Sequence, residues 1–277
     1  MLKFVRFPRR PKVSVCVPLY NTRPDLLRKM IESVLGQTFT DFEFLILNDS
    51  PDNKELGAIV AEYKDKRIIY KRNRRNLGIS GARNRLMDMA RGEYIAVHDH
   101  DDWSLPERFE KQVAFLDSHP HYGAVSCDYY INENIAENLM INVCRDNIDI
   151  KINFLYGCFF LHPGCMLRKS VLNKHGLRYE EEYSPSEDYR LFARLAEFTL
   201  FKTLPEPLLV YNMYGLNTSK VQQDRAMAME EEIKFFVKNK FPFSAIAQDI
   251  AILRQELGKI SQNLDNIAGI VNKRLDF

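Results

Sequence analysis

Short apolar runs alternate with segments of helical periodicity over residues 13–130, and this alternation constrains the fold more than any other feature of the chain. The segments between the runs carry apolar residues at spacings of three and four, which is typical of helices that bury one face. Strands that alternate with helices form a mixed, mostly parallel sheet flanked by helices. The chain is therefore predicted to be α/β. The expected strands are residues 13–17, 42–47, 67–72, 94–97 and 124–130, and the expected helices are residues 24–35, 54–63, 80–90 and 106–117.

The sequence after residue 130 is less regular. Residues 131–163 show no clear periodicity and are predicted to form loops over a site. Residues 186–198 begin with acids and continue with apolar residues at helical spacing, which predicts a helix, and residues 208–211 are predicted to be a strand. We therefore expect one domain over residues 12–218.

The C-terminal segment, residues 244–277, has a heptad pattern, and a separate helix is predicted before it over residues 219–243. Apolar residues in the segment repeat at spacings of four and three without a break, while almost all other positions are polar or small. So narrow a stripe on a helix without proline favours a coiled coil over a helix packed on its own domain, and it predicts a homo-oligomer. The seam residues are Ile246, Ile250, Leu253, Leu257, Ile260, Leu264, Ile267 and Val271.

Charge and composition narrow the functional class. A net charge of +2 argues against a nucleic-acid-binding protein, which would carry a strong basic excess. The five cysteines lack zinc-ligand spacing and are predicted to be reduced thiols, and no secretory signal is visible, so we expect a cytoplasmic protein. No apolar run approaches the roughly 20 residues that span a bilayer. Residues 1–11 form a basic segment that also contains apolar side chains. Two interpretations of it stay open: a frayed terminus, or a segment that contacts the inner face of an anionic membrane.

Polar residues follow three of the predicted strands. Pro18, Tyr20 and Asn21 come after the first strand, Asp49 comes after the second, and the cluster HDHDD at residues 98–102 comes after the strand at residues 94–97. Ligands bind to sheets of this class beyond the carboxyl ends of the strands. Because these polar groups converge on that one edge, the sequence predicts a binding site there.

The HDHDD cluster places three acids and two histidines in five residues. Such a cluster repels itself unless solvent or a cation neutralises it. Asp99 and Asp101 are two residues apart, so on an extended backbone both carboxylates point to one side, where they could bind Mg²⁺ or Mn²⁺. Asp102 could join them or cap the helix predicted from residue 106. His98 and His100 leave a transition-metal site open, although His98 directly follows the strand and favours a packed position.

Four segments occur in series over about residues 12–212: VSVCVPLYN, SVLGQTFTDFEFLILNDS, NLGISGARNRLMDMARGEYIAVHDHDD and SEDYRLFARL. Together they resemble the family 2 inverting glycosyltransferases with the GT-A fold, a Rossmann-like nucleotide-binding architecture. The resemblance implies metal-dependent transfer of a sugar from a nucleoside-diphosphate donor, most often UDP-linked. It also implies an acceptor hydroxyl on a glycan or a lipid-linked molecule, in the synthesis of surface polysaccharide or lipooligosaccharide.

The resemblance implies roles for the residues after the first two strands. Pro18, Tyr20 and Asn21 would hold the nucleotide base and ribose. Asp49 would accept a hydrogen bond from the base. Arg83, at the opening of a helix, would face the diphosphate or the base.

The resemblance also assigns the HDHDD cluster, which fills the family's metal-binding DxDD segment. Asp101 would bind most of the metal, and Asp99 would share the metal and lie near the ribose or donor sugar. His100 occupies a donor-side position that the family usually gives to a small residue. Asp102 is a secondary candidate.

The SEDYRLFARL segment would supply the catalytic base. Inversion requires one base that takes the proton of the acceptor hydroxyl on the face opposite the leaving group. Glu187 and Asp188 match the family's acidic pair, whose aspartate is the expected base, so Asp188 is the catalytic candidate and Glu187 a secondary one. The alternative interpretation, without a catalytic role, is that both acids only stabilise the helix by complementing its dipole. His162 matches a position that lines the donor phosphate.

Two other functions stay open. A sugar nucleotidyltransferase also uses acids, a metal and an α/β sheet, but it would carry a glycine-rich phosphate loop after the first strand, where residues 18–22 contain no glycine. A non-catalytic oligomeric scaffold with a retained nucleotide site would be expected to have lost its acids. Asp49, Asp99, Asp101 and Asp188 are all present.

Overall fold

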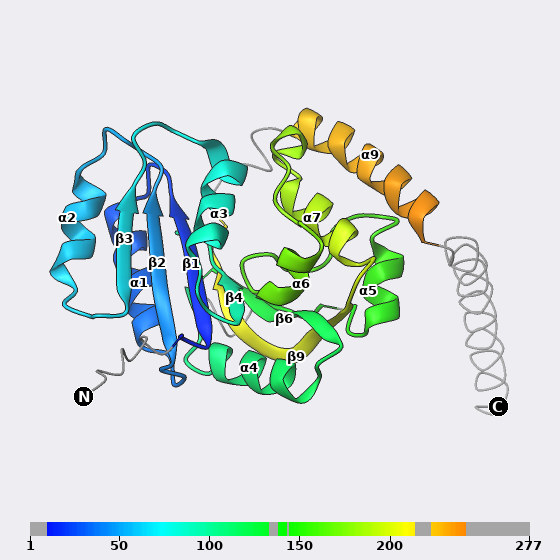
Figure 1. The fold of residues 1–277 in the computed structure, drawn as a ribbon, viewed down its shortest axis with the longest axis horizontal. Coiled ribbons are helices and arrows are strands. Elements are labelled where there is room, and N and C mark those ends of the chain that lie inside the picture. The colour runs from blue at the N-terminus through cyan, green and yellow to red at the C-terminus, as the bar shows by residue number, and fades with distance from the viewer. Residues whose placement is uncertain (1–9, 133–137, 143, 214–222, 242–277) are drawn as a thin grey trace, which may run out of the picture.

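The computed structural model describes residues 10–132, 138–142, 144–213 and 223–241 (Figure 1). The heptad segment and residues 1–9 of the basic segment lie outside these residues. The coiled coil, the homo-oligomer and the membrane contact therefore stay predictions.

One mixed sheet runs through the described part of the molecule, with the strand order β3-β2-β1-β4-β8-β6-β9-β5 and with β7 paired to β6 (Figure 1). The first four of these strands in the order, up to β4, pair in parallel. β8 then pairs antiparallel with both β4 and β6. This confirms the predicted α/β class. The strands are β1 Val13–Leu19, β2 Phe42–Asn48, β3 Ile68–Arg72, β4 Tyr94–Val97, β5 Trp103–Ser104, β6 Tyr122–Ile131, β7 Leu139–Met140, β8 Met166–Arg168 and β9 Leu200–Tyr211.

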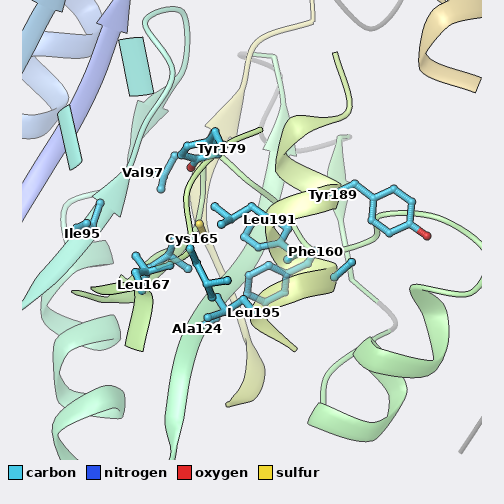
Figure 2. Close-up of a cluster of buried hydrophobic side chains, with 14 of the residues drawn as sticks. Ile95, Val97, Ala124, Phe160, Cys165, Leu167, Tyr179, Tyr189, Leu191 and Leu195 are labelled. Carbon is cyan, nitrogen blue, oxygen red and sulfur yellow. The ribbon is translucent and has the colours of Figure 1, made fainter. Parts of the chain in front are cut away.

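Helices cover both faces of the sheet (Figure 1). Side chains alternate along β1, so that Val15 and Val17 pack into a core with α1, α2 and α4, while Cys16 packs into a second core with α3, α5, α6, α7 and α9. Figure 2 shows part of this second core, to which Leu191 of α7 and Ile95 and Val97 of β4 all belong. The helices are α1 Pro24–Leu35, α2 Glu55–Glu62, α3 Gly78–Met89, α4 Arg108–Ser118, α5 Asn147–Asn153, α6 Lys169–Lys174, α7 Glu187–Leu195 and α9 Gln223–Lys240, with a 3₁₀ turn η1 at Glu181–Tyr183.

Burial of apolar side chains stabilises these helices more than capping of their ends does. α1 has no side-chain cap, yet it buries Leu27, Met30, Ile31 and Val34 at the spacing of one helical face. Burial of one such side chain contributes about 1.5–3 kcal/mol, whereas an N-cap contributes about 1 kcal/mol. The apolar stripe therefore decides where α1 forms, and the sequence prediction of residues 24–35 matches it.

The middle of the chain contains more regular structure than the sequence indicates. The predicted loops over residues 131–163 include β7 and α5, and β9 begins at Leu200, eight residues before the predicted strand. β8 has three residues and lies between two partner strands. An element this short shows no periodicity, so its antiparallel insertion between β4 and β6 leaves no sequence signal.

Candidate active site

The loops after β1 and β2 are tied together at the carboxyl edge of the sheet. The backbone N–H of Asp49 donates to the Leu19 carbonyl at 2.8 Å, and the N–H of Asn21 donates to Ser50 Oγ at 2.8 Å. Asn21 has a φ of 48°, in the left-handed region that asparagine tolerates better than most residues. Tyr20 is left 56% exposed beside it, and Pro18 is half-buried. The predicted base-and-ribose residues therefore share one edge with Asp49.

Asp49 is buried and already oriented. Its Oδ1 accepts a hydrogen bond from Asn73 Nδ2 at 2.5 Å, and the backbone N–H of Leu77 donates to both carboxylate oxygens at 3.0 Å. Asn73 and Leu77 both lie between β3 and α3, so the segment after β3 holds the carboxylate that follows β2. Sequence reasoning did not identify Asn73, because a single asparagine in a basic stretch is indistinguishable from a turn residue.

Arg83 joins two segments that are far apart in the chain. Its Nη2 donates to Asp99 Oδ1 at 2.9 Å, and its Nη1 donates to Glu187 Oε1 at 2.7 Å. Arg83 is 7% exposed and Glu187 is 2% exposed. Burial opposes ionisation of Asp99, but the charge of Arg83 and the hydrogen bond from its guanidinium outweigh burial and lower the pKa of Asp99 to about 2. The structure places Arg83 between the acidic cluster and the helix of the predicted base, and its expected role toward the nucleotide stays a prediction.

Asp102 does not cap the following helix. α4 begins at Arg108, its N-cap is Glu107, and no side chain caps it. Instead, Asp102 Oδ1 accepts a hydrogen bond from the backbone N–H of Asn212 at 2.8 Å, beyond the end of β9. Its Oδ2 is buried without a hydrogen-bond partner. Burial, followed by the charges of Asp101 and Asp99, raises the pKa of Asp102 well above its usual range. The capping alternative is therefore wrong.

The donor groups of the HDHDD cluster fit a hard divalent cation that is shared with a substrate. Among the residues that the structure describes, no three His, Cys, Asp or Glu side chains gather to hold a metal by themselves. Mg²⁺ typically binds to only one or two carboxylates and completes its shell with waters and substrate phosphates. Asp101 has a side chain that is 15% exposed, and the unpartnered Oδ2 of Asp102 lies one residue further on. This donor set suits such a shared ion.

The histidines of the cluster differ from each other. His98 is fully buried, and its Nδ1 lies 2.7 Å from the Asp99 carbonyl. Burial and the charge of Arg108 lower the pKa of His98 to about 3, so it is a packed residue, as its position after the strand predicts. His100 is partly exposed, and its Nδ1 lies 4.0 Å from Asp101 Oδ1.

His162 is buried in the loop before β8. Its Nε2 is 2.9 Å from the hydroxyl of Tyr179. Burial, and next the charge of Arg83, lower the pKa of His162 well below its usual range. As a neutral imidazole that contacts the Tyr179 hydroxyl, His162 has no positive charge to offer a phosphate. Its predicted role beside the donor phosphate stays a prediction.

Asp188 lies in the first turn of α7. The backbone N–H of Tyr189 donates to Asp188 Oδ1 at 2.7 Å. Burial and the neighbouring Glu187 raise the pKa of Asp188 to about 7. A carboxylate with this pKa can accept a proton near neutral pH, which suits a general base. The helix-dipole reading would lower the pKa instead.

A pocket of about 380 Å³ opens beside Asp188. Tyr129 and Tyr211 line it from two strands, and residues 158–163 line it from the loop before β8. Its rim is apolar, since Ile141 and Phe159 are 60% and 50% exposed. The sequence predicts loops over the site here, but it does not predict that their apolar residues face outward.

Comparison with known proteins decides the family. Residues 14–176 match the family described as Glycosyl transferase family 2. The chain is a family 2 glycosyltransferase. It is 37% identical over 211 residues to an uncharacterized glycosyltransferase of Methanocaldococcus jannaschii, a match that covers 74% of this chain and 71% of the relative. The family resemblance and the α/β fold predicted from the sequence are thereby confirmed.

Two further relatives have informative names. One is the Escherichia coli UDP-Glc:alpha-D-GlcNAc-diphosphoundecaprenol beta-1,3-glucosyltransferase, which is 28% identical over 184 residues and matches 66% of this family 2 chain and 69% of that protein. The other is the structure of a mannosyltransferase from Pyrobaculum calidifontis in complex with GDP-Man and Mn²⁺. It superimposes with a TM-score of 0.60 at 16% identity, over 88% of this chain and 76% of that one, which shows that the two share a fold.

Proposed function

We propose that the chain is an inverting glycosyltransferase that moves a sugar from a nucleoside diphosphate, most fittingly UDP, to the hydroxyl of a glycan or lipid-linked acceptor. The contact of Arg83 with both Asp99 and Glu187 carries this proposal. It brings the acidic cluster at the end of β4 against the first turn of α7, where Asp188 follows Glu187 directly. A donor site and a base with a pKa of about 7 then share one centre.

The donor would lie along the carboxyl edge of the sheet. Asp49 offers an oriented carboxylate to the N–H of a base, and Tyr20 and Asn21 lie beside it. A divalent cation, Mn²⁺ or Mg²⁺, would be held by Asp101 with Asp99, Asp102 is a secondary candidate, and His100 would lie on the side of the donor. When bound, such an ion neutralises charge on the departing diphosphate. The Mn²⁺ of the Pyrobaculum calidifontis complex supports this assignment by fold.

Asp188 would perform the proton transfer. The acceptor hydroxyl loses its proton to the Asp188 carboxylate, its oxygen forms a bond to the anomeric carbon, and the bond from that carbon to the diphosphate breaks on the opposite face. Attack from that face gives a beta linkage when the donor sugar is alpha-linked. The beta linkage in the name of the Escherichia coli relative is consistent with this outcome. Glu187 keeps Arg83 in place rather than reacting itself.

The acceptor would enter through the pocket beside Asp188. The apolar rim at Ile141 and Phe159 favours an acceptor that carries apolar groups next to its sugar, and burial of apolar surface supplies binding energy without directional contacts. The lipid diphosphate in the name of the Escherichia coli relative supports a lipid-linked acceptor. In the described part of the chain, no helix is both long and apolar enough to cross a bilayer. We propose that the enzyme works at the cytoplasmic face of the membrane, where it would build surface polysaccharide or lipooligosaccharide.

A donor screen tests this proposal. The protein is incubated with Mn²⁺ and a panel of UDP-, GDP- and dTDP-sugars, and the release of nucleotide is measured with and without acceptor lipids. We expect release from a UDP-sugar that depends on the metal. Release of pyrophosphate from a sugar phosphate and a nucleoside triphosphate would instead identify a nucleotidyltransferase.

A further inference from the structure

A buried arginine lies behind the acidic cluster. Arg108, in the first turn of α4, is 0% exposed and is the largest fully buried side chain in the described residues. The guanidinium keeps its charge in proteins. A buried charge is costly unless its hydrogen-bonding groups are satisfied. A side chain of this kind therefore has to make well-placed contacts.

Arg108 donates to four neutral oxygens. Its Nη2 donates to the Val97 carbonyl at 2.7 Å and to the Cys165 carbonyl at 3.1 Å. Its Nη1 donates to Ser104 Oγ at 3.0 Å, and its Nε donates to Gln112 Oε1 at 3.3 Å. The first three acceptors belong to the ends of β4 and β5 and to the residue before β8, so the guanidinium joins three strands.

Two of the oxygens that accept hydrogen bonds from Arg108 lie on either side of the HDHDD cluster in the sequence. Val97 is the last residue before the HDHDD cluster, and Ser104 is the second residue after it. Arg108 therefore holds the chain on both sides of the acidic residues. The Cys165 carbonyl also accepts a hydrogen bond from the backbone N–H of Val97 at 3.0 Å, so the arginine closes the end of the β4–β8 ladder where the chain turns into the cluster.

We propose that Arg108 is a positioning residue, which fixes residues 98–102 in the shape that binds the metal and the donor diphosphate. The inference rests on the proposed function for what those residues bind. The planar fork of arginine reaches several acceptors at once, whereas the ammonium of lysine is a single point. Arg108→Lys therefore keeps the charge but cannot keep all four contacts.

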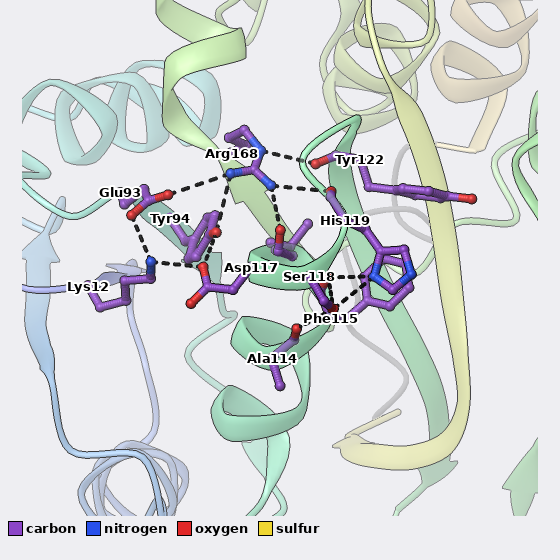
Figure 3. A network of polar contacts seen from close by, with 11 residues as sticks. Lys12, Glu93, Tyr94, Ala114, Phe115, Asp117, Ser118, His119, Tyr122 and Arg168 are labelled. Atoms are coloured by element: carbon purple, nitrogen blue, oxygen red, sulfur yellow. Dashed lines mark hydrogen bonds and ion pairs between the residues drawn. The ribbon is translucent and has the colours of Figure 1, made fainter.

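The chain contains a matched control at the opposite end of the same ladder. Arg168, the last residue of β8, donates to the carbonyls of Leu116 at 2.7 Å and Tyr122 at 3.1 Å and to the Tyr94 hydroxyl at 3.2 Å (Figure 3). Like Arg108 it joins separate elements through neutral oxygens, and in addition it pairs with Glu93 at 3.5 Å. Arg168→Lys thus removes comparable contacts at the amino end of β4, away from the cluster.

The experiment compares the full-length wild-type protein, Arg108→Lys and Arg168→Lys at a temperature where all three are folded by circular dichroism. Hydrogen exchange of the metal-free proteins reports the order of residues 97–104. Titration with Mn²⁺ in the presence of UDP, followed by electron paramagnetic resonance, reports metal affinity. We expect faster exchange over residues 97–104 in Arg108→Lys alone. We also expect its Mn²⁺ affinity to fall by about tenfold or more, as is typical when a residue that supports metal ligands is lost.

Unchanged exchange over residues 97–104 in Arg108→Lys would overturn the inference, and so would an equal loss of Mn²⁺ affinity in both variants. If Arg108→Lys does not fold, Ser104→Ala replaces it, since this change removes one acceptor and leaves the arginine. Weaker Mn²⁺ binding by Ser104→Ala supports the inference, and wild-type binding overturns it. If the wild-type protein binds no Mn²⁺ with UDP, the proposed function fails, while the exchange comparison still decides whether Arg108 orders the cluster.

Discussion

Arg83 contacts Asp99 at 2.9 Å and Glu187 at 2.7 Å, and thereby joins the loop after β4 to the start of α7, although Glu187 lies 104 residues away from Arg83 in the sequence. The side chain of Glu187 is 3% exposed. A buried carboxylate of this kind depends on its partner, because water cannot replace the lost charge. Arg83 therefore contributes both to stability and to the placement of Asp188.

Replacement of Arg83 should destabilise the protein strongly. Arg83→Met leaves Glu187 buried without a counter-charge, so we expect the free energy of unfolding to fall by about 3–5 kcal/mol, measured by urea denaturation at pH 7. The double variant Arg83→Met/Glu187→Met should recover most of the loss. Arg28→Met, which breaks an exposed ion pair with Glu62, should change stability far less. A small effect of Arg83→Met would contradict the assigned coupling.

The pH dependence of transfer should report Asp188. The base must be ionised to accept a proton, and its pKa is raised to about 7. We therefore expect kcat/KM to rise with pH through about 7 and then to level off, with a slope of one on the acid side. A flat profile between pH 5 and pH 8 would assign the proton transfer to another group.

The same pKa has a consequence for stability. The pKa of Asp188 in the folded protein lies above the ordinary aspartate value of about 3.9. Asp188 therefore contributes stability below pH about 4, and this contribution is lost as the pH rises through about 7. We expect Asp188→Asn to raise the melting temperature relative to wild type more at pH 8 than at pH 4, by about 2–4 °C for each 1 kcal/mol. An equal shift at both pH values would contradict the raised pKa.

The apolar rim should select the acceptor. Phe159→Ser removes an exposed ring beside the Asp188 pocket, so we expect the KM for a lipid-linked acceptor to rise by about tenfold, from the lost burial of apolar area. Nucleotide release without acceptor should not change. Phe235→Ser is the control, because Phe235 is 70% exposed on α9 and lines a separate groove against η1 and α7. An equal effect of both changes would exclude a specific acceptor contact.

Much of the fold follows from the sequence because its elements bury apolar stripes. The boundaries of α1 and β4 are predicted to the residue. One face of α1 is apolar along its whole length, and every residue of β4 is buried. β8 and α5 are not predicted from the sequence, because tertiary contacts determine the conformation of such short buried elements.

The candidate site is only partly readable from the sequence. Asp49 and the HDHDD cluster follow strands whose ends must meet, so the edge is predictable. Arg83 is predictable as a site residue by resemblance, but its two carboxylate partners depend on tertiary packing. Arg108 gives no signal, because an arginine in the first turn of a helix usually faces solvent. The contacts of Asp102 with Asn212 likewise require the folded β9 strand.

The C-terminal heptads lie outside the described residues, and their role is open to a direct test. Deletion of residues 244–277 should reduce the molar mass in light scattering to that of a smaller assembly or a monomer, because the seam would supply the contact between copies. The melting temperature of the remaining domain should change little. An unchanged number of subunits would show that the helix packs on its own chain.

The central claim is that Asp188 removes the acceptor proton at a site assembled by Arg83. The most direct measurement compares sugar transfer and UDP binding by wild type and Asp188→Asn, with Mn²⁺ and the donor that the screen identifies. We predict that transfer falls by about 10²–10⁴-fold, the usual contribution of a general base, while the Kd for UDP stays unchanged. Transfer by Asp188→Asn at a near-normal rate would contradict the account.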